Sequence, residues 1–138
     1  MTFKNKLSLL ALVAVLSAPV GAAEIDEARI KAYYAAWSGG NLDTLMGYFA
    51  PNAVYEDVAT GDLSTGTDAI RAFAKKFLEA TPGVKVEPTS ILIGTESAAV
   101  EWTMSAGTGA EAWSVRGVAM LKHEGGQITR ATDYWNAE

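Results

Sequence analysis

The sequence predicts an α+β domain, because two hydrophobic periodicities divide it into a helix-rich half and a strand-rich half. Over much of residues 24–81, apolar side chains recur at the three- and four-residue spacing of helices that bury one face. From residue 84 to residue 135 the spacing changes to two, as in strands with one buried face. Such an order predicts a curved, mainly antiparallel sheet wrapped around the helices.

Three helices are expected in the first half of the chain. Gly39-Gly40 ends the first helix, Asn41 is placed to cap the second, and Thr67 is placed to cap the third. The third helix stops at Thr81, before a Pro-Gly pair that cannot continue it. The helices are expected over residues 24–38, 42–49 and 67–81.

The strands are bounded by turn-forming residues. A first strand ends at Asp57, and residues 61–66 are typical of a loop. Pro88 indicates an edge strand or a bulge, because proline cannot donate to the sheet. Glu124-Gly125-Gly126 predicts a hairpin turn. The strands are expected over residues 53–57, 84–93, 99–105, 113–122 and 127–135.

Residues 1–23 have the composition of a secretory signal peptide. A short basic stretch precedes an apolar run, Leu7 to Leu16, that is too short to span a bilayer. Small residues follow, and cleavage after Ala22 or Ala23 fits the pattern equally well. We therefore expect one mature domain, residues 24–138, in the periplasm or secreted, with an uncleaved anchor as the alternative.

The expected mature domain is acidic and free of cysteine. Without residues 1–23 it has nine basic against sixteen acidic residues, a net charge of −7. This charge argues against nucleic acid as a partner, and against membrane binding after signal cleavage. The absence of cysteine excludes disulfides, thiol catalysis and thiolate metal sites.

Neither a metal nor an organic cofactor is expected. His123 is the only histidine, and its position just before a hairpin turn predicts an exposed side chain. One histidine without cysteine leaves few ligands for a transition metal. The chain also lacks a glycine-rich phosphate loop, a dinucleotide fingerprint and a Ser-His-Asp set.

Asp57 is the strongest functional candidate. It ends an apolar strand beside Tyr55, and an amphipathic helix follows that can keep water away. A buried, unpaired carboxyl has a raised pKa, and such a group can move protons on a hydrophobic small molecule. The alternative is an ordinary solvated or helix-capping aspartate.

Asp133 is the second carboxylate of interest. Strand alternation places it on the same face as Ala131 and Trp135, and a carboxylate on an apolar face usually has a partner. Arg116, on the neighbouring strand, is the candidate partner, so a structural ion pair and a catalytic role both remain open. If Asp57 and Asp133 lie within about 6 Å, each raises the pKa of the other.

Several large side chains are expected to line a pocket as well as to fill the core. Flat aromatic walls suit a ring-containing apolar ligand. The candidate ligand-binding residues are Trp37, Tyr55, Trp102, Met104, Arg116, Val118, Met120 and Trp135.

Residues 25–136 resemble the nuclear transport factor 2-like superfamily, in particular its SnoaL-like polyketide cyclases and ketosteroid isomerases. The stretch VYEDVATGDLSTGTDAIRAFAKKFL, residues 54–78, is similar to the isomerase segment that holds the catalytic aspartate. The ending ITRATDYW, residues 128–135, is similar to the last strand of SnoaL-like proteins and limonene epoxide hydrolases. The resemblance implies a cone-shaped α+β barrel with N-terminal helices packed against a curved sheet.

The resemblance also implies residue roles. Asp57 takes the place of the isomerase general base, and Tyr33 that of the hydrogen-bond donor to the enolate, with its neighbour Tyr34 left to packing. Asp133 matches the acid/base aspartate of the cyclases. The isomerase's second donor, an acid, should lie at residues 118–120, where this chain has none. The epoxide hydrolase triad is also incomplete.

The expected function is cofactor-free acid/base chemistry on a small hydrophobic carbonyl compound, by isomerisation, cyclisation or hydration. Asp57, Tyr33 and Asp133 would be the catalytic residues. Two alternatives are an exported domain that binds a ligand without chemistry, and an interaction domain that dimerises through its open sheet face. A homodimer is expected in either case.

Overall fold

The structure is a computed structural model that describes residues 24–136. The expected signal peptide, residues 1–23, lies outside the described residues, so its assignment stays a prediction. Within the described range, no helix is long and apolar enough to cross a membrane.

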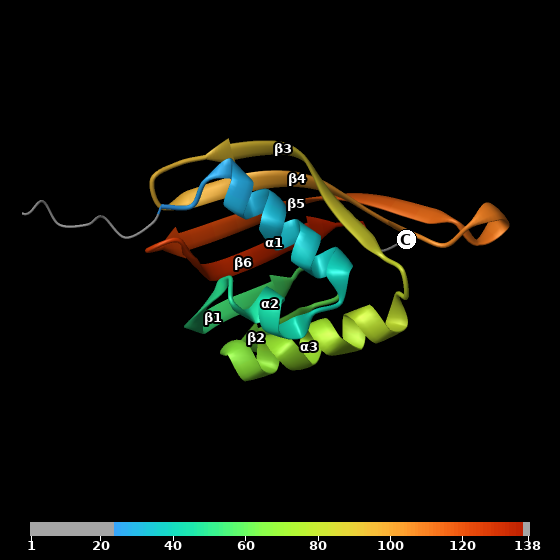
Figure 1. Ribbon diagram of the computed structural model, residues 1–138, viewed down its shortest axis with the longest axis horizontal. Helices are drawn as coiled ribbons and strands as arrows, with labels where there is room; N and C mark the ends of the chain where they lie inside the picture. Colours follow the sequence, from blue (N-terminus) through green and yellow to red (C-terminus); the bar gives the residue numbers. More distant parts are fainter. Residues whose placement is uncertain (1–23, 137–138) are drawn as a thin grey trace, which may run out of the picture.

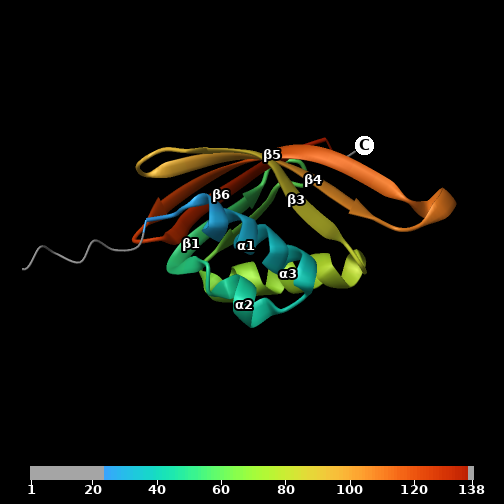
Figure 2. The same ribbon diagram turned by 45° about the horizontal axis from the view of Figure 1, so that its top comes forward.

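The fold is α+β, as the sequence predicts. Six strands form one curved, open sheet in the order β2-β1-β6-β5-β4-β3, with β1 and β6 parallel and the other neighbours antiparallel. All three α-helices lie on the concave side of the sheet (Figure 2). The helices are α1 (Glu27–Gly39), α2 (Leu42–Met46), α3 (Thr67–Ala80) and a short 3-10 helix, η1 (Gly109–Glu111). The strands are β1 (Phe49–Asp57), β2 (Asp62–Thr65), β3 (Lys85–Ile93), β4 (Ser97–Ala106), β5 (Trp113–Glu124) and β6 (Gln127–Trp135).

Two predictions for the region around the first strand are wrong. The second helix ends at Met46, and Phe49 begins β1 instead of ending the helix. Phe49 pairs with Ile128 of β6, a contact distant in sequence that local periodicity cannot reveal. The predicted loop at residues 61–66 contains β2, which pairs with β1.

The prediction for Pro88 is confirmed in both respects. The register of β3 against β4 shifts between Pro88 and Ser90, and β3 is an edge strand. The alternation predicted for β4 is also confirmed, because Val100, Trp102 and Met104 are all buried on one face.

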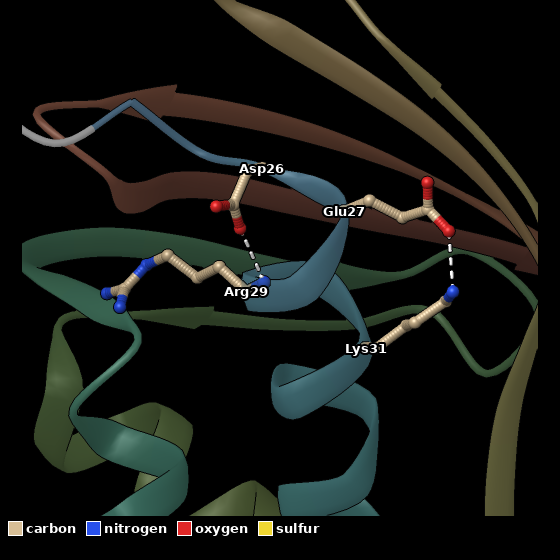
Figure 3. A network of polar contacts seen from close by, with 4 residues as sticks. All are labelled: Asp26, Glu27, Arg29 and Lys31. Atoms are coloured by element: carbon tan, nitrogen blue, oxygen red, sulfur yellow. Dashed lines mark hydrogen bonds and ion pairs between the residues drawn. The ribbon is translucent and has the colours of Figure 1, made fainter.

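The first turn of α1 is fixed by polar contacts (Figure 3). The Asp26 side chain accepts a hydrogen bond from the backbone N–H of Arg29 at 2.7 Å, and Glu27 pairs with Lys31 at 2.5 Å. Arg29 also donates to the carbonyl of Gly126, in the β5–β6 turn, and its guanidinium lies 5.0 Å from the ring centre of Tyr48. These contacts hold α1 across the sheet, so its aromatic face is directed at the strands.

His123 corrects a prediction. It is 8 % exposed and lies inside β5, one residue before the strand ends, instead of at an exposed hairpin tip. The hairpin turn begins only at Gly125, and alternation along β5 puts His123 on the same inner face as Ala119 and Leu121. Its Nε2 has no hydrogen-bond partner among the described residues.

Candidate active site

A pocket of about 750 Å³ lies between the inner face of the sheet and helices α1 and α3. This volume is typical of a small-molecule site. Its polar lining includes Asp57, Asp62, Asp133 and Lys76. Nine lining residues are aromatic: Tyr33, Tyr34, Trp37, Tyr55, Phe73, Phe77, Trp102, Trp113 and Trp135.

Asp133, on β6, has the carboxyl group best poised for proton transfer. One of its oxygens accepts a hydrogen bond from the Tyr55 hydroxyl, and the other accepts one from Trp102 Nε1 at 3.0 Å. Burial raises the pKa of Asp133 to about 6; the charge of Asp57 acts in the same direction, while the two hydrogen bonds oppose the shift. The group therefore changes charge close to neutral pH, as acid/base catalysis requires.

Asp57 is held differently from the expected unpaired carboxyl. It is 7 % exposed, and its Oδ1 accepts hydrogen bonds from Trp135 Nε1 at 2.9 Å and from the backbone N–H of Thr60 at 3.1 Å. Its Oδ2 accepts no hydrogen bond from the described part of the chain. Asp57 is the direct parallel-strand partner of Asp133, so the two carboxylates lie side by side in the pocket wall.

Gly117 creates the space through which Trp102 reaches Asp133. It lies on β5, opposite Trp102 of β4 on one side and Trp135 of β6 on the other. A Cβ atom on Gly117 would lie only 2.3 Å from Trp102 Cζ2. The missing side chain therefore lets the indole cross β5. Sequence reasoning missed this residue, whose only signal was a glycine inside a strand.

Both tyrosines of α1 line the pocket, although the resemblance gave the donor role to Tyr33 and left Tyr34 to packing. Tyr33 and Tyr34 are 2 % and 3 % exposed, with ring centres 5.1 Å apart in an edge-to-face contact. The inward face of α1 is wide, because Ile30, Ala36 and Trp37 are buried with them.

Both hydroxyl groups remain protonated at neutral pH. Burial raises the pKa of Tyr33 and of Tyr34, and the charge of Asp133 raises both further. The hydroxyl of Tyr34 is fully buried and has no partner among residues 24–136. Tyr33 is therefore a neutral hydroxyl in the pocket wall, and a hydrogen-bond donor to a ligand must be neutral in this way.

Arg116, Val118 and Met120 do not belong to the pocket, contrary to expectation. Asp133 pairs in register with Ala119, which shares the inner face with Val115 and Gly117, so residues 116, 118 and 120 point outward. The expected Asp133–Arg116 ion pair is therefore absent from the described structure, and Arg116 is exposed.

The other predicted ligand-binding residues are brought together by the fold. Trp37 from α1, Tyr55 from β1, Trp102 and Met104 from β4, and Trp135 from β6 all line the pocket. Val115 of β5, and Phe73 and Phe77 of α3, also line the pocket but were not identified as ligand-binding residues; the apolar spacing of α3 indicated only a buried face. Within residues 24–136, no three His, Cys, Asp or Glu side chains gather as a metal site would need.

The chain is similar to known proteins in both sequence and fold. The profile of the SnoaL-like domain matches residues 30–131. A search of curated proteins finds no match. Many solved structures share the fold, and three of them illustrate its range.

A protein of ketosteroid isomerase-like fold from Catenulispora acidiphila, solved with trimethylamine, is 26% identical; the match covers 82% of this chain and 88% of that one, with a TM-score of 0.72. TerC, co-crystallised with polyporic acid, is 17% identical over 79% of this chain and 89% of its own, with a TM-score of 0.69. An epoxide hydrolase from M. tuberculosis is 18% identical over 79% of this chain and 80% of its own, with a TM-score of 0.67. The last two similarities show the fold alone.

Replacing Gly117 by alanine tests the role of the gap below Trp102. The new Cβ collides with the indole, so we expect Gly117→Ala to lower the free energy of unfolding by about 1–3 kcal/mol. The displaced Trp102 no longer donates to Asp133, and losing a bond that stabilises the carboxylate raises the pKa of Asp133 above about 6. Urea denaturation and a carboxyl titration by NMR measure the two effects.

Gly39→Ala is the matched control, since no atom lies within 4 Å of the added Cβ at that position. We expect Gly39→Ala neither to lower the free energy of unfolding nor to raise the pKa of Asp133. An unchanged pKa of Asp133 in Gly117→Ala would show that the glycine does not position Trp102.

Proposed function

The chain belongs to the family of SnoaL-like domains, and from this premise we propose that it catalyses cofactor-free acid/base chemistry on a small hydrophobic molecule with a carbonyl group. Isomerisation, cyclisation and hydration are the reaction types that such chemistry serves. The observation that carries the proposal is Asp133, a carboxyl with a pKa of about 6 in the wall of an aromatic pocket.

The two aspartates have separate roles in this proposal. Asp57 Oδ2 has no hydrogen bond within the described structure, so it is free to contact an acidic C–H or O–H group of the ligand. Asp133 exchanges protons near neutral pH, while Tyr55 and Trp102 hold its carboxyl plane in place. The charge of Asp57 acts on its neighbour, because it helps to raise the pKa of Asp133.

Tyr33 is the proposed donor to the ligand's oxygen. Its hydroxyl stays protonated because burial raises its pKa, and a neutral donor stabilises the negative charge that develops on a carbonyl oxygen. A second donor of the isomerase type is missing, because the inward-facing residue of the 118–120 segment is Ala119. This absence argues against efficient steroid isomerisation.

A second candidate function is ligand binding without turnover. The aromatic pocket supports it, as does the fact that two proteins of similar fold were solved with small molecules bound. An exported location, predicted from residues 1–23, suits a binding role in the periplasm. The two candidates differ in whether a bound ketone loses protons.

Deuterium exchange separates catalysis from binding without requiring the natural substrate. We expect the wild-type protein to accelerate exchange of the protons next to the carbonyl in a panel of cyclic ketones in D₂O, followed by proton NMR. Because the base must be ionised, the rate should rise as the pH increases through about 6. Asp57→Asn and Asp133→Asn should each lower it by about 10²–10⁴-fold, the usual contribution of one general base.

Glu101→Gln is the control for this experiment. It removes the same charge from an exposed position outside the pocket, and the exchange rate should not change. Ketones that bind to the wild type but exchange no faster than in buffer would reject the catalytic function and support the binding function.

The outer face of the sheet supports a homodimer as a further proposal. Met120 and Tyr134 are 44 % and 49 % exposed on the neighbouring strands β5 and β6. Polar Glu101 and Thr103 lie nearby on β4, which suits a hydrated interface. In sedimentation at micromolar concentration, the wild type should be a dimer, and Met120→Glu should shift it towards monomer.

Ala35→Glu is the control, because Ala35 is exposed on helix α1, which packs against the opposite, concave face of the sheet. It should leave the dimer intact. A monomeric wild type at these concentrations would reject the dimer.

A further inference from the structure

The two carboxylates in the pocket wall have no cationic partner in the described structure. Within residues 24–136, Asp57 and Asp133 accept hydrogen bonds only from neutral donors: a hydroxyl, two indoles and one backbone N–H. The ion pairs of residues 24–136 are Glu27–Lys31, Asp43–Arg71, Lys75–Glu79 and Glu56–Arg130. Buried charges are usually paired with an opposite charge, so this site departs from the general rule.

The pocket as a whole has an excess of negative charge. Asp57, Asp62 and Asp133 line it, and among residues 24–136 Lys76 of α3 is the only basic lining residue. No ion pair joins Lys76 to any of these aspartates within the described structure. Asp57 Oδ2 also accepts no hydrogen bond there. A ligand that entered with a positive charge would supply the missing partner.

The rest of the wall suits an organic cation better than a metal ion. Nine aromatic residues line the pocket, and aromatic faces attract cations that carry alkyl groups. A hard metal ion would instead need several more oxygen ligands than the two carboxylates provide. Aromatic rings around a carboxylate pair therefore combine cation–π attraction with direct charge pairing.

We propose that this pocket selects ligands with an organic cation, a protonated amine or quaternary ammonium on a hydrophobic frame, and that Asp57 and Asp133 are its counter-ions. The proposal rests on the proposed function, since it names the charge class of the molecule that the same pocket takes. It adds a discrimination that a purely hydrophobic pocket would lack. Neutral molecules of the same shape bind more weakly, because they leave the carboxylates unpaired.

A pair of probes with the same shape isolates the charge. Phenyltrimethylammonium and tert-butylbenzene differ in one central atom, a positive nitrogen in place of carbon. Titration of tryptophan fluorescence at pH 7.5 and low salt should give a Kd at least tenfold lower for the cation. Trp37, Trp102, Trp113 and Trp135 all line the pocket and report its occupancy.

Changes to the aspartates and to the pH test the counter-ions. Asp57→Asn and Asp133→Asn should each lower the affinity for the cation and so remove most of the preference for it, whereas the affinity for tert-butylbenzene should not fall. Glu101→Gln, which removes an exposed charge outside the pocket, should retain the preference. Circular dichroism establishes that each variant is folded.

Lowering the pH from 7.5 to 5 tests the same point in the wild type and needs no variant. Asp133 becomes protonated in this interval, so the preference for the cation should fall several-fold. The three tyrosines that line the pocket with Asp133, namely Tyr33, Tyr34 and Tyr55, stay protonated throughout, because burial raises their pKa. The titratable groups lining the pocket with Asp133 are Tyr33, Tyr34, Tyr55, Asp57, Asp62 and Lys76.

The outcomes separate this proposal from the proposed function. Equal Kd values for the two probes, or tighter binding of tert-butylbenzene, would overturn the cation preference and leave a working hydrophobic pocket. Failure of both probes to bind would overturn the cation proposal and also count against the ligand pocket. A preference that persists in both aspartate variants and at pH 5 would overturn the role of Asp57 and Asp133.

Discussion

The site depends on one constraint, which is that two neighbouring carboxylates, buried Asp57 and half-buried Asp133, are held in the pocket wall only by neutral hydrogen-bond donors among residues 24–136. Strands β1 and β6 place Asp57 and Asp133 side by side, and Tyr55, Trp102 and Trp135 bind them. Withdrawal from water without a cationic partner keeps the pKa of Asp133 near 6. The proposed proton transfer and the proposed preference for cations both follow from this arrangement.

Much of the fold could be predicted from periodicity, because helices and strands with one buried face carry their pattern in the sequence. The alternation of β4 and the apolar face of α3 are examples. The start of β1 could not be predicted, since Phe49 becomes a strand residue only through pairing with Ile128, which lies far along the chain. His123 was predicted at an exposed turn, because the nearby glycines indicate a turn but do not reveal that β5 continues to Glu124.

The site was predicted in part. Sequence similarity and alternation identified Asp57, Tyr33 and Asp133, and all three line the pocket. The sequence did not reveal which face of β5 is buried. Two large apolar residues, Val118 and Met120, occupy its outer face, and small residues occupy part of its inner face. Alternation fixes which residues share a face, whereas packing against α1 and α3 decides which face is buried. The hydrogen-bond donors to each carboxylate depend on the same packing.

Titration of the aspartate carboxyl carbons by NMR tests the central claim most directly. In the wild type, with the signal of Asp133 assigned by its absence in Asp133→Asn, we expect half-protonation near pH 6. That result would show a carboxyl withdrawn from water and without a cationic partner. A midpoint near the ordinary aspartate value of about 3.9 would contradict the account, because it would mean that water or a cation stabilises the carboxylate.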